Sequence, residues 1–269
     1  MPKQVYSEVI NLAASSDRRD MMTSEFAKAG LTPIFEPAVH FREVPAEFLA
    51  QYCLPSGPWG RTRPGHMATT ISHMKAWERF LATEHSFCAV FEDDVFVAED
   101  LGAWFDDMSW WPEDADIVKL EAWRRNGSSA LIEVTGNPWR GRRVSRLLTR
   151  HMGAAGYVLT RAAAEKLLNA RPYDMVIDHV LFNFNASKVS GKLACYQVVP
   201  ALVTQGNEVS ASSRMDMADP IGRIEHVLRE ARRGLLELAY PVKTYWKLLS
   251  GAARFEKISY RGALDQDEQ

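Results

Sequence analysis

Short apolar runs alternate along the chain with segments of helical periodicity. Turn residues bound the apolar runs, which predicts β-strands at Val5–Leu12, Phe87–Phe91, Ile117–Leu120, Ala154–Leu159 and Cys195–Val203. Apolar positions three and four residues apart predict helices from the end of the polar turn at residues 15–17 to Ala29, from Gly65 to Thr83 and from Arg161 to Ala170. Strands that alternate with helices are typical of an α/β sheet.

Four segments fit this alternation less well. Leu31–Val39 reads as a strand interrupted by proline, and Pro45–Pro64 is rich in proline, glycine and aromatic residues, which predicts an irregular flap. Asn126–Arg146 has no clear period, so a loop and a hairpin both stay open. Asp174–Phe184 is largely apolar around the acidic residue Asp178.

The chain changes character at about Asp219. Between Arg223 and Arg261 there are nine basic and four acidic residues. One helical face there collects the apolar residues Ile221, Ile224, Leu228, Ala231, Leu235 and Leu238. We therefore expect a domain over residues 1–218 and a basic amphipathic helical tail over residues 219–269. Three interpretations of the tail stay open: packing on the domain, homodimer formation, and docking on an anionic membrane surface.

Composition narrows the function classes. The chain of 269 residues is 46% hydrophobic and 25% charged, which is ordinary for a globular protein. A net charge of -2 argues against a nucleic-acid-binding protein, whose domain is normally strongly basic. Three widely spaced cysteines show no disulfide or metal pattern. With neither a signal peptide nor a run of about 20 apolar residues, we expect a cytoplasmic protein, peripheral on the inner membrane if the tail docks there.

Three adjacent carboxylates, Glu92, Asp93 and Asp94, follow the strand predicted at Phe87–Phe91. Their charges repel one another and aspartate is unfavourable inside a strand, so stability does not explain the cluster. Oxygen ligands on a short loop suit Mg²⁺ or Mn²⁺, and ligands of open α/β sheets bind beyond the carboxyl ends of the strands. The cluster therefore indicates a metal that bridges to a phosphate group, with an acidic surface turn as the plainer alternative.

Two arginines, Arg18 and Arg19, follow the first predicted strand. The same carboxyl edge of the sheet would hold them, and arginine suits bidentate contact with phosphate. A solvated helix start is the alternative. Two independent features at one edge favour a phosphate-binding site.

Several motifs together resemble one known family. Residues 65–77 are similar to a Gly-Glu-Ile-Gly-Cys-x-Leu-Ser-His-x-x-x-Trp segment, residues 91–94 to Leu-Glu-Asp-Asp, and residues 153–161 to Gly-x-x-Gly-Tyr-x-Ile-Ser-Arg. Val9–Leu12 with Arg18 downstream looks like the opening of the same family, and Asp178 stands where the family has an Asp before an apolar pair. This is glycosyltransferase family 25, bacterial lipopolysaccharide enzymes and their collagen-modifying relatives. The resemblance runs from Val5 to Gln205.

The sequence departs from the family pattern in three places. His66 replaces a glutamate, Ala68 and Thr69 replace Gly-Cys, and residues 39–41 replace Val-Asp-Gly. The change at His66 alters the charge near the Ser-His helix. It motivates the rival hypothesis of a degenerate homologue that binds a nucleotide sugar or saccharide without turnover. A second rival, a metal-dependent nucleotidyltransferase, would more often carry a glycine-rich loop after the first strand, and residues 13–16 are not one.

The resemblance implies a GT-A fold and transfer of a hexose, galactose or glucose, from a UDP-sugar to a hydroxyl of a saccharide or lipid-linked saccharide. The acceptor would be a bacterial surface saccharide such as lipooligosaccharide. Mn²⁺ or Mg²⁺ would neutralise the leaving diphosphate. By resemblance, Asp94 and Glu92 bind the metal. Asn11, Arg18, Ser72, His73 and Asp93 are then expected around the nucleotide, and for Asp93 the metal stays open as the alternative partner.

The family is associated with inversion at the sugar carbon, which requires a base for the acceptor hydroxyl. Asp178 is the first candidate, because a carboxylate inside an apolar stretch is costly unless it is used or capped. Glu121, at the end of a short predicted strand, is the second. A hydrogen-bonded structural role is the alternative for both.

Overall fold

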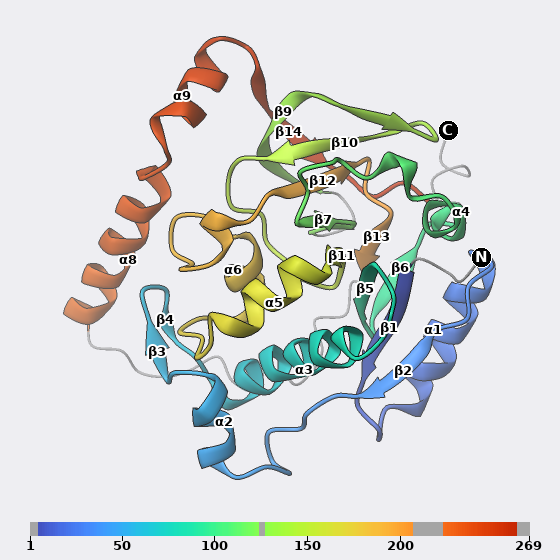
Figure 1. Ribbon diagram of the computed structural model, residues 1–269. Helices are drawn as coiled ribbons and strands as arrows, with labels where there is room; N and C mark the ends of the chain where they lie inside the picture. The colour runs from blue at the N-terminus through green and yellow to red at the C-terminus, as the bar shows by residue number, and fades with distance from the viewer. Residues whose placement is uncertain (1–4, 124–126, 207–222, 263–269) are drawn as a thin grey trace.

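A nine-stranded mixed sheet forms the centre of the computed structural model, which describes residues 5–123, 127–206 and 223–262 (Figure 1). The strand order is β14-β9-β10-β12-β7-β11-β5-β1-β2. The strands are β1 (Val5–Asn11), β2 (Ile34–Pro37), β5 (Phe87–Glu92), β7 (Ile117–Lys119), β9 (Ser128–Trp139), β10 (Arg142–Leu147), β11 (Gly156–Thr160), β12 (Cys195–Val199) and β14 (Ala253–Ile258). The expected α/β fold is confirmed.

Strand direction brings several segments to one edge of this sheet. β1 pairs in parallel with β2 and β5, whereas β11 runs antiparallel between β5 and β7. The carboxyl ends of β1, β5 and β7 and the amino end of β11 therefore meet at one edge. A small second sheet, β6-β13-β8, joins Val95–Val97, Val203–Gln205 and Glu121–Ala122.

Helices cover both faces of the sheet. The predicted helices are confirmed as α1 (Ser16–Lys28), α3 (Pro64–Leu81) and α5 (Arg161–Asn169), with shorter helices α2 (Ala46–Tyr52), α4 (Leu101–Asp106) and α6 (Ile177–Phe182). Phe91 on β5 packs edge-on against Phe26 of α1 at 5.0 Å between ring centroids. Side chains alternate along a strand, so the neighbouring Glu92 points to the opposite face, where α3 lies.

Four segments differ from their predictions in detail. The flap predicted at residues 45–64 contains α2 and a short pairing of β3 (Ser56–Gly57) with β4 (Gly60–Arg61). The segment at residues 126–146 is the hairpin β9–β10, so that alternative is correct. The proline-interrupted strand shortens to β2, and the late strand divides into β12 and β13 around Pro200, since proline cannot donate to a ladder.

The end of the chain differs more. α8 (Arg223–Leu238) and α9 (Val242–Leu249) confirm helices in the tail, although Ile221 lies outside the described residues. The tail is not helical throughout, because β14 pairs antiparallel with β9 and forms an edge of the central sheet. Across the described ranges, no helix combines the length and apolar character that crossing a bilayer requires.

Candidate active site

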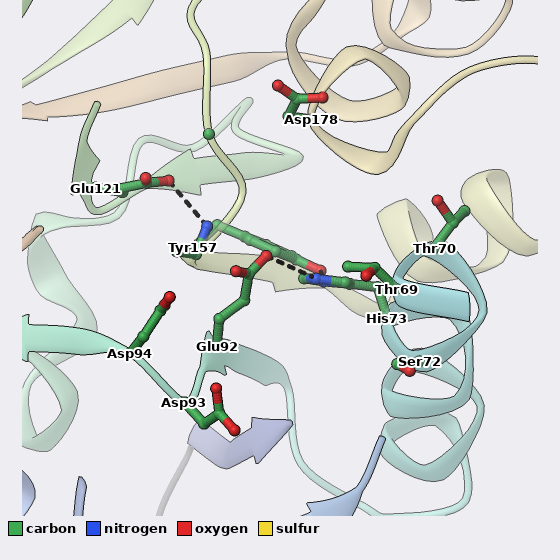
Figure 2. Close-up of polar contacts among 12 residues, drawn as sticks. Thr69, Thr70, Ser72, His73, Glu92, Asp93, Asp94, Glu121, Tyr157 and Asp178 are labelled. Atoms are coloured by element: carbon green, nitrogen blue, oxygen red, sulfur yellow. Dashed lines mark hydrogen bonds and ion pairs between the residues drawn. The ribbon is translucent and has the colours of Figure 1, made fainter. Parts of the chain in front are cut away.

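The carboxylate cluster lies where the parallel strands end. Asn11 is the last residue of β1 and Glu92 the last of β5, and the register that pairs Ile10 with Glu92 brings the two ends together. Asp93 and Asp94 form the turn that leads into β6. Figure 2 shows the three acidic side chains fanning out from this turn, with Glu92 directed toward α3. The predicted cluster is thus assembled at the expected edge.

Asp93 is held by two partners from the first strand and helix. Asn11 Nδ2 donates to Asp93 Oδ2 over 2.7 Å, and Arg18 Nη1 donates to Asp93 Oδ1 over 2.6 Å. Arg19 Nε donates in turn to Asn11 Oδ1 over 3.4 Å. The aspartate is therefore largely satisfied by the fold, and it anchors Arg18 beside the cluster.

Glu92 carries a charge that the fold disfavours. Its Oε2 accepts a hydrogen bond from Gln205 Nε2 over 3.2 Å, and its Oε1 lies 3.5 Å from His73 Nε2. Burial, with the negative charges of Asp93 and Asp178, raises the pKa of Glu92 to about 7. At neutral pH this group is poised between its two protonation states.

The surroundings of Asp94 also disfavour its charged form. Its Oδ1 is buried without a hydrogen-bond partner among the described residues, and its Oδ2 lies 3.9 Å from Arg18 Nη1. Burial and the neighbouring charge of Glu92 raise the pKa of Asp94 to about 7. Two half-buried carboxyl groups two residues apart, one of them with a buried oxygen that has no partner among the described residues, have the donor chemistry of a site for a hard cation.

Buried hydrogen bonds fix the orientation of His73, the histidine of α3. Burial lowers the pKa of His73 to about 4, so its ring is neutral at pH 7. Trp77 Nε1 donates to the hydroxyl oxygen of Tyr157 over 2.9 Å, and that hydroxyl lies 2.9 Å from His73 Nδ1. This arrangement favours a hydroxyl proton directed at Nδ1, which leaves the proton on Nε2 facing Glu92.

Ser72, the other residue of this helix that was predicted to contact the nucleotide, makes hydrogen bonds within the fold. Ser72 Oγ donates to the carbonyl of Ala68 and accepts from the backbone N–H of Val39, both over 2.8 Å. Through these two hydrogen bonds the buried Ser72 side chain joins α3 to the loop after β2. The replaced position His66 is exposed in the first turn of α3. Seven residues, or roughly 10 Å of helix, separate it from His73.

Glu121 lies in a buried cluster behind the carboxylates. Its Oε2 accepts from the backbone N–H of Ala155 over 2.9 Å and lies 3.8 Å from Lys119 Nζ. Lys119 also donates to the carbonyls of Met152 and Gly153. Gly153 has φ +88, and a Cβ there would lie 2.4 Å from Glu121 Oε1. Burial raises the pKa of Glu121 and lowers that of Lys119.

Asp178 faces the same region from α6. It is half-buried in the first turn of that helix, and its Oδ1 accepts from the backbone N–H of His179 over 2.8 Å. Its charge contributes to the raised pKa of Glu92 and of Glu121. In Figure 2 the Asp178 side chain is drawn on α6, above Tyr157 and Glu92. The structure therefore brings together every predicted site residue except Ser72.

Three residues of the site were not predicted from the sequence. Lys119, Tyr157 and Gln205 lie around the carboxylates but were not among the predicted site residues. A signal existed for Lys119, since a lysine inside an apolar strand must find partners. Tyr157 lies within the Gly-x-x-Gly-Tyr motif. Gln205 has no local signal, because only the pairing of β13 with β6 brings it to Glu92.

Comparison with known proteins identifies the family. Residues 5–181 match the family described as glycosyltransferase family 25 (LPS biosynthesis protein). The chain belongs to glycosyltransferase family 25. The resemblance and the enzyme class expected from the motifs are therefore confirmed.

Bacterial lipooligosaccharide and lacto-N-neotetraose biosynthesis proteins are among its relatives. Lipooligosaccharide biosynthesis protein lic2B of Haemophilus influenzae is 24% identical over 212 residues, covering 75% of this family 25 chain and 76% of the relative. The lacto-N-neotetraose biosynthesis glycosyltransferase LgtE of Neisseria gonorrhoeae is 28% identical over 218 residues, covering 74% and 73%. A solved glycosyltransferase involved in glycosylation of the major capsid of PBCV-1 aligns with 87% of this chain and 99% of its own, at 10% identity and a TM-score of 0.40.

Proposed function

We propose that this family 25 glycosyltransferase transfers a hexose, galactose or glucose, from a UDP-sugar to a hydroxyl of a bacterial surface saccharide such as lipooligosaccharide, with inversion. The observation that carries the proposal is the pair of half-buried carboxyl groups with raised pKa values, Glu92 and Asp94, beside Arg18 at the strand ends. The names of the relatives, which refer to lipooligosaccharide and lacto-N-neotetraose biosynthesis, support the acceptor class.

The donor set fits a divalent cation that is completed by substrate. Within the described ranges, no three His, Cys, Asp or Glu side chains form a metal cage. Mg²⁺ and Mn²⁺ are commonly held by one or two carboxylates, with phosphate and water oxygens filling the other positions. Glu92 and Asp94 would hold the cation, which when bound neutralises charge on the leaving UDP. Arg18 supplies a further positive charge next to the diphosphate.

Asp178 is the better of the two candidates for the base. Its side chain is half-buried and can meet an acceptor, whereas Glu121 is fully buried and bonded to Ala155. In a single displacement, the bond from the sugar carbon to the acceptor oxygen forms as the bond to UDP breaks, and Asp178 takes the hydroxyl proton. Glu121 acts as a positioning residue, since with Lys119 it fixes the turn at residues 152–155.

A donor screen tests the function directly. The protein is incubated with UDP- and GDP-sugars and Mn²⁺, with and without acceptor extract, and free nucleotide is measured. We expect release from UDP-galactose or UDP-glucose. Binding of a UDP-sugar without release or transfer from any donor would favour the degenerate homologue motivated by His66.

The metal role has its own test. Asp94→Asn should weaken Mn²⁺-dependent UDP binding roughly a hundredfold, because a charged oxygen ligand is lost. The control is Asp20→Asn, the same chemical change on the exposed face of α1. Titration calorimetry with UDP and Mn²⁺ measures both variants, and an unchanged affinity in Asp94→Asn would remove the metal role assigned here.

A further inference from the structure

The helices α8 and α9 direct their large apolar side chains away from the protein. Among the described residues, seven on these helices are between 64% and 78% exposed, and together they are termed the tail face: Val227, Leu228, Leu235, Leu238, Val242, Trp246 and Leu249. Elsewhere in the described chain, exposed large hydrophobic residues occur singly. Seven large apolar side chains exposed on two successive helices form an apolar patch, and such a patch on a protein surface marks an interaction site.

The opposite side of the same helices and the residues between them make the contacts with the domain, and the contacts described here are polar. Arg233 donates to the carbonyl of Trp59, and the Tyr240 hydroxyl accepts from the backbone N–H of Arg150 over 3.1 Å. Asn185 Nδ2 donates to the carbonyl of residue 236 over 2.7 Å, and Lys247 pairs with the side chain of residue 133. The helices are therefore held with their apolar face turned outward.

The position of the two helices leaves this face accessible. Figure 1 shows α8 and α9 (orange and red) at the margin of the molecule, outside the sheet and the helices that cover it. The polar contacts of the preceding paragraph hold them there. A flat partner could reach both helices at once.

The charges next to the tail face are positive. Arg232 and Lys243 are exposed and have no acidic partner within the described part of the chain. The acidic residues of α8 whose side chains the structure describes are engaged, Glu230 with Arg233 over 2.8 Å and Glu237 with Arg150. Apolar side chains flanked by unpaired basic residues, with Trp246 among them, match the composition of helices that lie in a membrane interface.

We propose that α8 and α9 dock this protein on the surface of an anionic lipid bilayer, with the tail face in the headgroup region and Arg232 and Lys243 on lipid phosphates. Charge decides between this partner and a second copy of the chain. A symmetric dimer through the tail face would bring two surfaces of the same positive charge together, and Glu230 and Glu237 on α8 already pair with arginines of their own chain. An anionic surface attracts Arg232 and Lys243.

Vesicle flotation of the full chain tests the proposal without sugar donor or acceptor, so its outcome is separate from that of the transfer reaction. Vesicles of phosphatidylethanolamine and phosphatidylglycerol are compared with pure phosphatidylcholine. We expect the protein to float with the anionic vesicles, at least about tenfold more than with the neutral ones, and less so in high salt.

Paired substitutions locate the contact. Leu238→Gln with Trp246→Gln, one on each helix, should lower binding to anionic vesicles roughly tenfold or more. The matched control is Ile34→Gln with Phe255→Gln, two exposed apolar residues outside α8 and α9. Thermal unfolding checks that both double variants remain folded, and point variants are preferred to truncation because β14 follows α9 in the central sheet.

Arg232→Gln with Lys243→Gln separates the electrostatic part. This pair should weaken binding to anionic vesicles and leave the weak binding to neutral vesicles unchanged. Absence of binding by the unaltered protein, or equal loss in the Ile34/Phe255 control, overturns the proposal. So does a concentration-dependent dimer that the Leu238/Trp246 variant abolishes while vesicle binding is absent.

Discussion

At the scale of single residues, the cost of burying charge explains most of the site. Burial and the neighbouring carboxylates raise the pKa of Glu92 and of Asp94, and Arg18, which lies 2.6 Å from Asp93 Oδ1 but 3.9 Å from Asp94 Oδ2, offsets this only in part. The fold thus gives Asp93 hydrogen-bond and ion-pair partners, whereas the negative charges of Glu92 and Asp94 are not fully balanced by positive groups. Under-compensated groups of this kind gather at functional sites, where a ligand supplies what the protein lacks.

Lys119 is the residue whose removal should be most damaging. Lys119→Met leaves Glu121 and the carbonyl of Gly153 buried without their cation, so we expect a loss of roughly 3–5 kcal/mol in the free energy of unfolding. Lys166→Met is the control, since Lys166 pairs with Asp116 at the surface and should cost about 1 kcal/mol or less. Urea denaturation measures both. Equal, small losses would show that the buried cluster is not essential to the fold.

The acid cluster, the arginines and Asp178 could be predicted because their local sequence is unusual. Adjacent carboxylates after an apolar strand, or an aspartate inside an apolar stretch, are costly wherever they lie. Ser72 was predicted near the nucleotide, but helical periodicity does not reveal that its hydroxyl binds the loop at Val39. Contacts of this kind depend on which loop crosses which helix.

At the scale of elements, hydrophobic pattern and length predicted strands and helices well where periods were clear. β1, β5, α3 and α5 lie within a few residues of their predicted bounds. Short strands were harder, because two or three residues carry no period. β14 was missed altogether, since a tail with strong helical amphipathicity hides a strand that is defined by its partner, β9.

β14 should contribute to the stability of the central sheet. Ile258 is fully buried and Phe255 on the same strand is exposed, so the two side chains lie on opposite faces. Ile258→Ser should lower the free energy of unfolding by roughly 2–5 kcal/mol, and Phe255→Ser by about 0.5 kcal/mol. Chemical denaturation compares the pair, and similar losses in both would mean that this edge is not packed as described.

At the scale of the whole molecule, the site couples stability to pH and to ligand. The pKa of Glu92 and of Asp94 is higher in the folded protein than in the unfolded chain, so the stability they contribute is present at low pH and is lost as pH rises through about 7. A cation that binds their ionised forms must displace their protons below this pH. The affinity for the ligand should therefore increase over the same pH range in which the ligand-free protein loses stability.

This coupling predicts the pH dependence of stabilisation by ligand. UDP with Mn²⁺ should raise the free energy of unfolding at pH 8, by about 2.7 kcal/mol at a hundredfold excess over the dissociation constant. At pH 6 the same concentrations should stabilise less, because protons compete for Glu92 and Asp94. Thermal unfolding at the two pH values measures the difference, with UDP alone and Mn²⁺ alone as controls. A larger effect at pH 6 would contradict the assignment.

The sequence by itself determined the α/β class, the family and the edge of the sheet where the acidic cluster would lie. These follow from periods, from local charge cost and from motif order, which are properties of short segments. Tertiary structure alone decided that Gln205 and His73 meet Glu92, that Lys119 stands behind Glu121, and that α8 and α9 turn their apolar face outward. Each of these depends on strand pairing or helix packing between segments far apart in the chain, and no local pattern encodes which segments those are.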